Sequence, residues 1–209
     1  MARNPIRTLK SLFPWPDERP GLPKRSERWF SAKKQVLLRK VIPSDVKLIV
    51  ELGSWLGDST QWFCKQYPEA TVVAVDTWLG STEHLVKRHT LLPILYDTFL
   101  VNCWEYRDRL IPFRNTSLGA LNFLSQLKLK PDTIYFDSDH SLWGLLSELE
   151  VANSLFSEAV FIGDDYTTSN TVGDALHSFT EYEQPSQGGS LWRGWTIESL
   201  NYTWTVRKK

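Results

Sequence analysis

Short apolar runs alternate with longer segments of helical periodicity from about residue 47 onward. Runs without an alternating polar face are typical of strands buried on both faces. Five strands are predicted in this way, at residues 47–52, 71–76, 110–113, 132–137 and 159–163. Because strand and helix alternate along the chain, the pattern predicts an α/β fold with a single Rossmann-like, doubly wound and mostly parallel sheet.

Apolar positions spaced three and four apart predict the helices, at residues 31–42, 59–67, 94–107, 118–128, 141–156 and 171–181. Ser59 or Thr60 is expected to cap the helix after the first strand. Two β-rich runs between Leu191 and Val206 flank residues 197–201, and they predict a C-terminal antiparallel hairpin at the edge of the sheet.

The first 30 residues differ in composition from the rest of the chain. They contain five prolines and many basic residues, which predict an extended arm with little regular structure, followed by one domain at 31–209. Residues 1–47 hold 12 Lys and Arg against 4 Asp and Glu, although the whole chain is neutral. Such an arm is compatible with binding to nucleic acid, a membrane surface or an acidic protein, and equally with a solvated segment. No nucleic-acid-binding motif is present, so no nucleic-acid partner is expected.

The cysteines and the hydropathy of the chain indicate the cellular compartment to expect. Cys64 and Cys103 are the only cysteines, and neither belongs to a CxxC motif. A disulfide framework and a structural zinc site are therefore not expected, which favours a reducing, cytoplasmic location. No apolar run approaches the roughly 20 residues of a membrane span.

Polar residues collect just after the predicted strands: Glu51 and Gly53, then Asp76, then Asp137, then Asp164 and Asp165. The carboxyl ends of parallel strands meet at one edge of an open α/β sheet, where ligands bind. The sequence therefore predicts a binding site with an acidic rim.

The glycine turn after the first strand admits three kinds of cofactor. A dinucleotide site requires GxGxxG, but Trp55 stands in place of the middle glycine, and a P-loop requires a Lys that does not follow Gly57. S-adenosylmethionine suits the turn because Glu51 can lie near its cation, free amides near its carboxylate, and Asp76 near its ribose hydroxyls. A tight strand-to-helix turn without a ligand is the remaining alternative.

Four segments carry a resemblance to a known family: VELGSWLGDST, VVAVDTWLGS, IYFDSDHS and FIGDDYTTSNTVGDAL. Over residues 47–182 the chain resembles class I S-adenosylmethionine-dependent methyltransferases. More narrowly, it is similar to metal-dependent O-methyltransferases that act on sugars of macrolide antibiotics and related glycans. The resemblance implies cofactor contacts from Glu51, Gly53, Ser54, Gly57, Ser59 and Asp76, with Trp78 and Ser81 near the adenosine and Ser117 near the adenine.

A metal site is expected where the fourth and fifth strands end. Neighbouring strands lie about 4.8 Å apart, so the carboxylates of Asp137, Asp164 and Asp165 can converge on one ion. Oxygen ligands favour Mg²⁺, then Mn²⁺ or Ca²⁺. The alternative for Asp164 and Asp165 is a helix cap with a solvated neighbour, and strand alternation is expected to turn Asp139 away from the site.

His140 is the candidate general base. A sugar hydroxyl has a pKa far above 7, a bound cation lowers it, and a neutral imidazole can then accept the proton. By the resemblance, Asp137 and His140 pair a metal ligand with the base. The expected function is methyl transfer from S-adenosylmethionine to a sugar hydroxyl of a glycan or glycosylated metabolite.

Other functions stay open at this point. A catechol-like diol is an alternative acceptor, and a non-catalytic cofactor-binding partner subunit is an alternative role. A metal-dependent phosphatase or nuclease would leave the glycine turn and Asp76 unexplained. The sequence is also compatible with a homo-oligomer or with one part of a larger multidomain enzyme.

Overall fold

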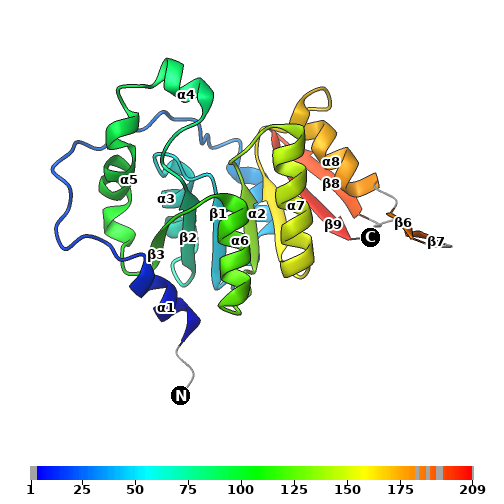
Figure 1. Cartoon of the computed structure of the whole chain (residues 1–209), viewed down its shortest axis with the longest axis horizontal. Coiled ribbons are helices and arrows are strands. Elements are labelled where there is room, and N and C mark those ends of the chain that lie inside the picture. The colour runs from blue at the N-terminus through cyan, green and yellow to red at the C-terminus, as the bar shows by residue number, and fades with distance from the viewer. Residues whose placement is uncertain (1–3, 182–183, 187–188, 192–194, 209) are drawn as a thin grey trace.

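The computed structural model describes residues 4–181, 184–186, 189–191 and 195–208. A seven-stranded sheet runs through the molecule with helices on both faces (Figure 1). Its strands are β1 (Leu48–Leu52), β2 (Thr71–Asp76), β3 (Leu110–Arg114), β4 (Thr133–Phe136), β5 (Val160–Gly163), β8 (Trp195–Leu200) and β9 (Thr203–Lys208). The order is β3-β2-β1-β4-β5-β9-β8, in which β9 runs antiparallel to both β5 and β8 and the other pairs are parallel. The predicted fold class is confirmed.

Two apolar cores lie on opposite faces of this sheet. Strand alternation sends Val50 to the core that α6, α7 and α8 cover, and Ile49 to the core that α2, α3 and α5 cover. The helices are α1 (Pro5–Leu12), α2 (Gln35–Val41), α3 (Asp58–Gln66), α4 (Thr82–Lys87), α5 (Leu95–Cys103), α6 (Ser117–Gln126), α7 (Leu142–Phe156) and α8 (Thr171–Glu181). Short 3₁₀ helices cover Leu92–Ile94 and Trp104–Tyr106, and β6 (Gln184–Ser186) pairs with β7 (Gly189–Leu191) in a separate ribbon.

The C-terminal hairpin is confirmed, but its turn was predicted too early. Residues 197–200 belong to β8, and the chain reverses at Asn201 and Tyr202, which both have positive φ. Ile197 packs against the core, so the strand continues through the segment expected to break it. The predicted first run began at Leu191, and residues 192–194 lie outside the described residues.

The N-terminal arm contains one helix that the sequence did not predict. Residues 5–12 form α1, which begins with Pro5 and is capped by the Asn4 side chain. Leu9 is fully buried, and the Phe13 ring lies 4.2 Å from the Phe113 ring on β3. The arm is therefore attached to the sheet by apolar contacts that a search for local periodicity does not detect.

Among the described residues, no helix combines the length and the apolar content that crossing a membrane requires.

Candidate cofactor and metal site

A cleft of about 1250 Å³ opens at the carboxyl edge of the parallel strands. The predicted site residues that line it are Gly53, Ser54, Ser59, Asp76, Ser81, Ser117, Asp137, His140, Asp164 and Asp165. Glu51, Gly57 and Trp78 are not among the described lining residues. They belong to the β1–α3 turn or its supports, so any effect they have on a ligand must pass through that turn.

Glu51 is fully buried beneath the turn and accepts three hydroxyl hydrogen bonds. Ser54 Oγ donates at 2.8 Å, Ser59 Oγ at 2.5 Å, and the Thr60 hydroxyl also donates. Burial raises the pKa of Glu51 to about 7, although these hydroxyls oppose the shift. Glu51 therefore organises the turn from inside the protein.

The same hydrogen bonds explain why the predicted helix cap is wrong. Gly57 occupies the N-cap position of α3 and makes no side-chain cap. The hydroxyls of Ser59 and Thr60 point to Glu51 instead, because a buried carboxylate needs partners more than an accessible helix end does. The first amides of α3 are thus not covered by a capping side chain.

Both glycines of the turn are required by close packing. Gly53 and Gly57 have φ of 87° and 86°, a region that side chains rarely adopt. A Cβ on Gly53 would collide with the backbone of Asp137 and Ser138, and one on Gly57 would collide with the Cys103 sulfur. The Asp137 amide also donates to the Leu52 carbonyl at 2.8 Å. Main-chain contacts thus join the glycine turn to the loop after β4.

Asp76 holds the turn from the β2 side. Its Oδ2 accepts the amides of Ser54 at 3.1 Å and Trp55 at 2.8 Å, and its Oδ1 accepts the Trp78 amide at 2.7 Å. Burial raises its pKa, and these hydrogen bonds oppose the shift. The Thr77 backbone also hydrogen-bonds to Asp76, so four backbone groups match the roughly four acceptor positions of this carboxylate.

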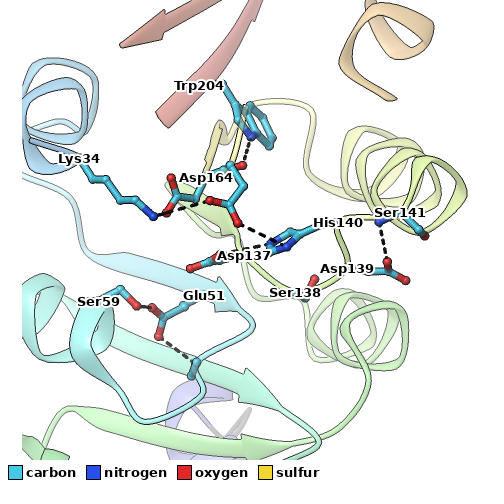
Figure 2. Close-up of polar contacts among 12 residues, drawn as sticks. Lys34, Glu51, Ser59, Asp137, Ser138, Asp139, His140, Ser141, Asp164 and Trp204 are labelled. Carbon is cyan, nitrogen blue, oxygen red and sulfur yellow. Dashed lines mark hydrogen bonds and ion pairs between the residues drawn. The ribbon is translucent and has the colours of Figure 1, made fainter. Parts of the chain in front are cut away.

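Asp137, His140 and Asp165 converge at the other side of the cleft. Figure 2 shows the side chains of Asp137 and His140 in contact. His140 Nε2 lies 3.4 Å from Asp137 Oδ1, and His140 Nδ1 lies 3.4 Å from Asp165 Oδ2. One ligand atom from each residue lies within 4.8 Å of the others, which suits a metal ion. Asp139 is not part of this cluster and accepts the Ser141 amide at 2.8 Å.

The predicted metal set is assembled only in part, because Asp164 faces Lys34. The ammonium of Lys34 pairs with Asp164 Oδ2 and lies 3.7 Å from Asp165 Oδ1. Asp164 Oδ1 is buried and has no hydrogen-bond partner among the described residues. Asp165 has a positive φ of 62°, which turns its side chain toward His140 rather than along that of Asp164.

The charged groups in this cluster shift one another's pKa values. Burial raises the pKa of Asp137 and of Asp164, while their partners His140 and Lys34 oppose the shifts. The hydrogen bond to Asp137 raises the pKa of His140 to about 9, against the effect of burial. In this arrangement the imidazole is protonated near neutral pH, and cationic side chains balance the carboxylates.

Residues 25–34, here called the strap, form a wall of the cleft that the sequence did not predict. Ser26 Oγ donates to Asp58 at 2.6 Å, and the Arg28 amide donates to the same carboxylate at 3.1 Å. Trp29 stacks on Trp55 of the glycine turn with ring centroids 5.9 Å apart. These partners are remote in sequence, so no local signal marks them.

Glu148 is a further cleft residue that sequence reasoning missed. It projects from α7, is 4 % exposed and accepts the Ser138 hydroxyl at 2.6 and 2.8 Å. Burial raises its pKa to about 7, against hydrogen bonds from Ser138 and Ser117. A buried acid on a helix with an otherwise apolar inner face is the signal that could have revealed it.

No protein-family model matches the chain, and no curated protein matches it. Solved structures do. An O-methyltransferase from Bacillus cereus in complex with SAH has 17% identity and a TM-score of 0.58, over 98% of this chain and 89% of that chain. TomG from Streptomyces achromogenes, an O-methyltransferase in complex with SAM, has 14% identity and a TM-score of 0.57, over 85% and 79%. The chain shares its fold with these two proteins.

This fold is not tied to one acceptor. Precorrin-6y C5,15-methyltransferase from Geobacter metallireducens has 11% identity and a TM-score of 0.55, over 90% of this chain and 93% of that chain. At such identities the likeness concerns the fold. The reaction must be argued from the residues in the cleft.

Proposed function

We propose that this protein is an S-adenosylmethionine-dependent O-methyltransferase that uses a divalent cation and acts on a sugar hydroxyl with a neighbouring hydroxyl. The observation that best supports this proposal is the close approach of Gly53 to the backbone of Asp137 and Ser138. It supports the proposal because the glycine turn and the acidic cluster line the same cleft. A metal-dependent phosphatase or nuclease would need the acidic cluster but not the glycine turn.

The cofactor half of the proposal uses the β1 and β2 edge. Residues at the start of α3 line the cleft, and their backbone amides, which no side chain caps, would receive a carboxylate. Asp76 lines the cleft at the end of β2 and would lie near the ribose hydroxyls. Ser81 and Ser117 line the same cleft and would lie along the adenosine. Glu51, Gly57 and Trp78 would act indirectly, by shaping the turn.

The metal half uses the β4 and β5 edge. Asp137 and Asp165 would hold a Mg²⁺ or Mn²⁺ ion, with Asp164 as a third carboxylate. Such an ion supplies Lewis-acid activation, which lowers the pKa of a nearby hydroxyl. The oxygen-only carboxylate set, together with the buried unpartnered Asp164 Oδ1, fits a hard cation.

His140 would hold the proton that the acceptor loses. The reaction forms an oxygen–carbon bond to the methyl group and breaks the carbon–sulfur bond, so the hydroxyl proton must leave. His140 lies between Asp137 and Asp165, within the cluster that would bind the acceptor. Added positive charge on these carboxylates would weaken their hold on the imidazolium and favour the neutral base.

Two measurements test the function in order. Calorimetry with S-adenosylhomocysteine should show binding, and absence of binding at about 1 mM would contradict the cofactor assignment. Methyl transfer to a panel of sugars and phenolic diols, followed by mass spectrometry, should collapse with EDTA and return with Mg²⁺. Full activity of EDTA-stripped protein would exclude the metal role.

A catechol-like diol is the second candidate acceptor, and an aromatic surface in the cleft is compatible with it. Trp29, Trp55 and His84 form a stacked aromatic wall along the cleft, with the Trp55 and His84 rings 4.1 Å apart. Flat aromatic acceptors and sugar rings both stack on such a surface. The product panel separates the two acceptor classes.

A further inference from the structure

Lys34 is a cation that the protein itself brings to the acidic cluster. Its ammonium pairs with Asp164 Oδ2 and lies 3.7 Å from Asp165 Oδ1. Its side chain is 16 % exposed and that of Asp164 is 2 % exposed, so both charges are largely withdrawn from water. Figure 2 shows the Lys34 side chain reaching Asp164. An ion pair in such a place interacts much more strongly than one at the surface.

The position of Lys34 is built into the fold. Lys34 lies immediately before α2, and its carbonyl accepts the Thr203 hydroxyl at 3.3 Å. The preceding carbonyl, of Lys33, accepts the Asn201 side chain at 3.1 Å. The C-terminal hairpin therefore holds the backbone from which the Lys34 side chain reaches the cluster. Lys33, one residue earlier, is exposed.

Asp164 offers a second, unused ligand atom. Its Oδ1 is buried without a hydrogen-bond partner among the described residues, while Oδ2 is held by Lys34. A buried carboxylate oxygen without a partner is costly, and a cation relieves that cost. Asp164 thus keeps Lys34 on one oxygen and adds its charge beside the cluster of Asp137, His140 and Asp165.

The charges then explain what Lys34 does. Asp137, Asp164 and Asp165 together carry three negative charges when ionised, and Lys34 cancels one of them. Burial lowers the pKa of Lys34, but the hydrogen bond and charge of Asp164 outweigh that effect and raise it, so the residue stays positive. With His140 in its neutral form, as the proposed base requires, two negative charges remain, which match one divalent ion.

We propose that Lys34 reduces the net negative charge of this metal site. The site then selects a divalent cation and binds that cation with moderate affinity. The inference rests on the proposed metal site and adds a residue outside the predicted ligand set. Removing Lys34 would leave three negative charges, which favour tighter binding and especially favour a trivalent ion.

The expected effect scales with the charge of the ion. The repulsion between Lys34 and a bound cation is proportional to the cation's charge at a given distance. The change in the logarithm of affinity should therefore be about one and a half times larger for a trivalent than for a divalent ion. A tenfold gain for Mn²⁺ would accompany a gain of about thirtyfold for Tb³⁺.

The test compares Lys34→Met with Lys34→Arg and Lys33→Met in the full chain. Mn²⁺ affinity is measured by electron paramagnetic resonance, and Tb³⁺ affinity by tryptophan-sensitised luminescence. Lys34→Met should bind Mn²⁺ on the order of tenfold more tightly and should gain more for Tb³⁺. Lys34→Arg keeps the charge and Lys33→Met keeps the pair, so both should resemble the wild type.

Two results would overturn the inference: unchanged or weaker metal binding by Lys34→Met, or the same gain in Lys34→Arg. Thermal unfolding of each variant verifies folding, and Lys34→Gln replaces Lys34→Met if that variant fails to fold. S-adenosylhomocysteine binding on the same samples separates the two proposals. A wild type that binds the cofactor product but no Mn²⁺ would refute the metal site itself, whereas metal binding that ignores Lys34 would refute only its role.

Discussion

The two halves of the cleft satisfy their buried acids in different ways. On the β1 and β2 side, Glu51 and Asp76 are bonded by hydroxyls and amides of the turn they support. On the β4 and β5 side, Asp137 and Asp164 are balanced by the cationic side chains of His140 and Lys34. Neutral local donors make the first half a rigid scaffold, whereas exchangeable charges leave the second half ready to accept an ion.

The largest effect should come from the charged half, through His140→Ala. Loss of the proposed base should lower the methyl-transfer rate by about 10²–10⁴-fold. S-adenosylhomocysteine affinity should change less than about twofold, because the scaffold half is untouched. His89→Ala is the matched control, since His89 is exposed and does not line the cleft. A normal rate for His140→Ala would require another base.

Gly53→Ala should disturb both halves at once. The added Cβ meets the backbone of Asp137 and Ser138 at a φ of 87°, so neither strain nor collision can be avoided. We expect the free energy of unfolding to fall by about 2–4 kcal/mol and cofactor binding to weaken at least tenfold. Chemical denaturation and calorimetry measure these changes. Gly21→Ala, which meets nothing within 4 Å, should be nearly neutral, and similar losses in both variants would contradict the packing argument.

The raised pKa of Glu51, on the β1 and β2 side of the cleft, predicts that the free energy of unfolding depends on pH. Its native pKa of about 7 exceeds the ordinary value of 4.5, so the native state binds its proton more tightly than the unfolded state. This contribution to stability is full below pH 4.5 and is lost as the pH rises through 7, at a cost on the order of 1–3 kcal/mol. Urea denaturation at pH 5 and pH 8 should show the decline.

Glu51→Gln removes that titration. The decline in unfolding free energy between pH 5 and pH 8 should become smaller in Glu51→Gln, whatever the absolute stability of the variant. Glu69→Gln, at an exposed position, should keep the wild-type decline. An identical pH dependence in Glu51→Gln and the wild type would show that other groups are responsible.

The smallest effect is expected at the strap. Trp29 is 48 % exposed and stacks on Trp55, so Trp29→Ala should cost no more than about 1.5 kcal/mol of stability. Dissociation of S-adenosylhomocysteine, followed by stopped flow, should become faster because a wall of the cleft is lost. Trp143→Ala, at a 73 % exposed position, serves as the control. A much larger loss of stability would place the strap in the core rather than at its margin.

The parallel sheet and its acidic edge were predictable because both depend on local patterns. Buried strands appear as continuous apolar runs, and Asp76 and Asp137 follow two of them directly. The contacts made by Lys34 were not predictable, since its partner lies 130 residues away.

The helix cap shows the same limit on a shorter scale. Ser59 and Thr60 have the right side chains and the right place for capping, and local preference alone would assign them that role. The buried Glu51 competes for their hydroxyls, and its requirement is the stronger one. A local rule fails where a tertiary contact makes a larger demand on the same atom.

The contact between Gly53 and the loop after β4 is made by main-chain atoms, whose positions depend little on which side chains surround them. In the proposed enzyme, the separation between methyl donor and cation would therefore withstand most substitutions in the cleft walls. The strap and α4, which line the cleft without belonging to that contact, could change to suit different acceptors while the reacting centre keeps its dimensions. Substitutions in the cleft walls would then change which acceptors bind without changing the distance between methyl donor and cation.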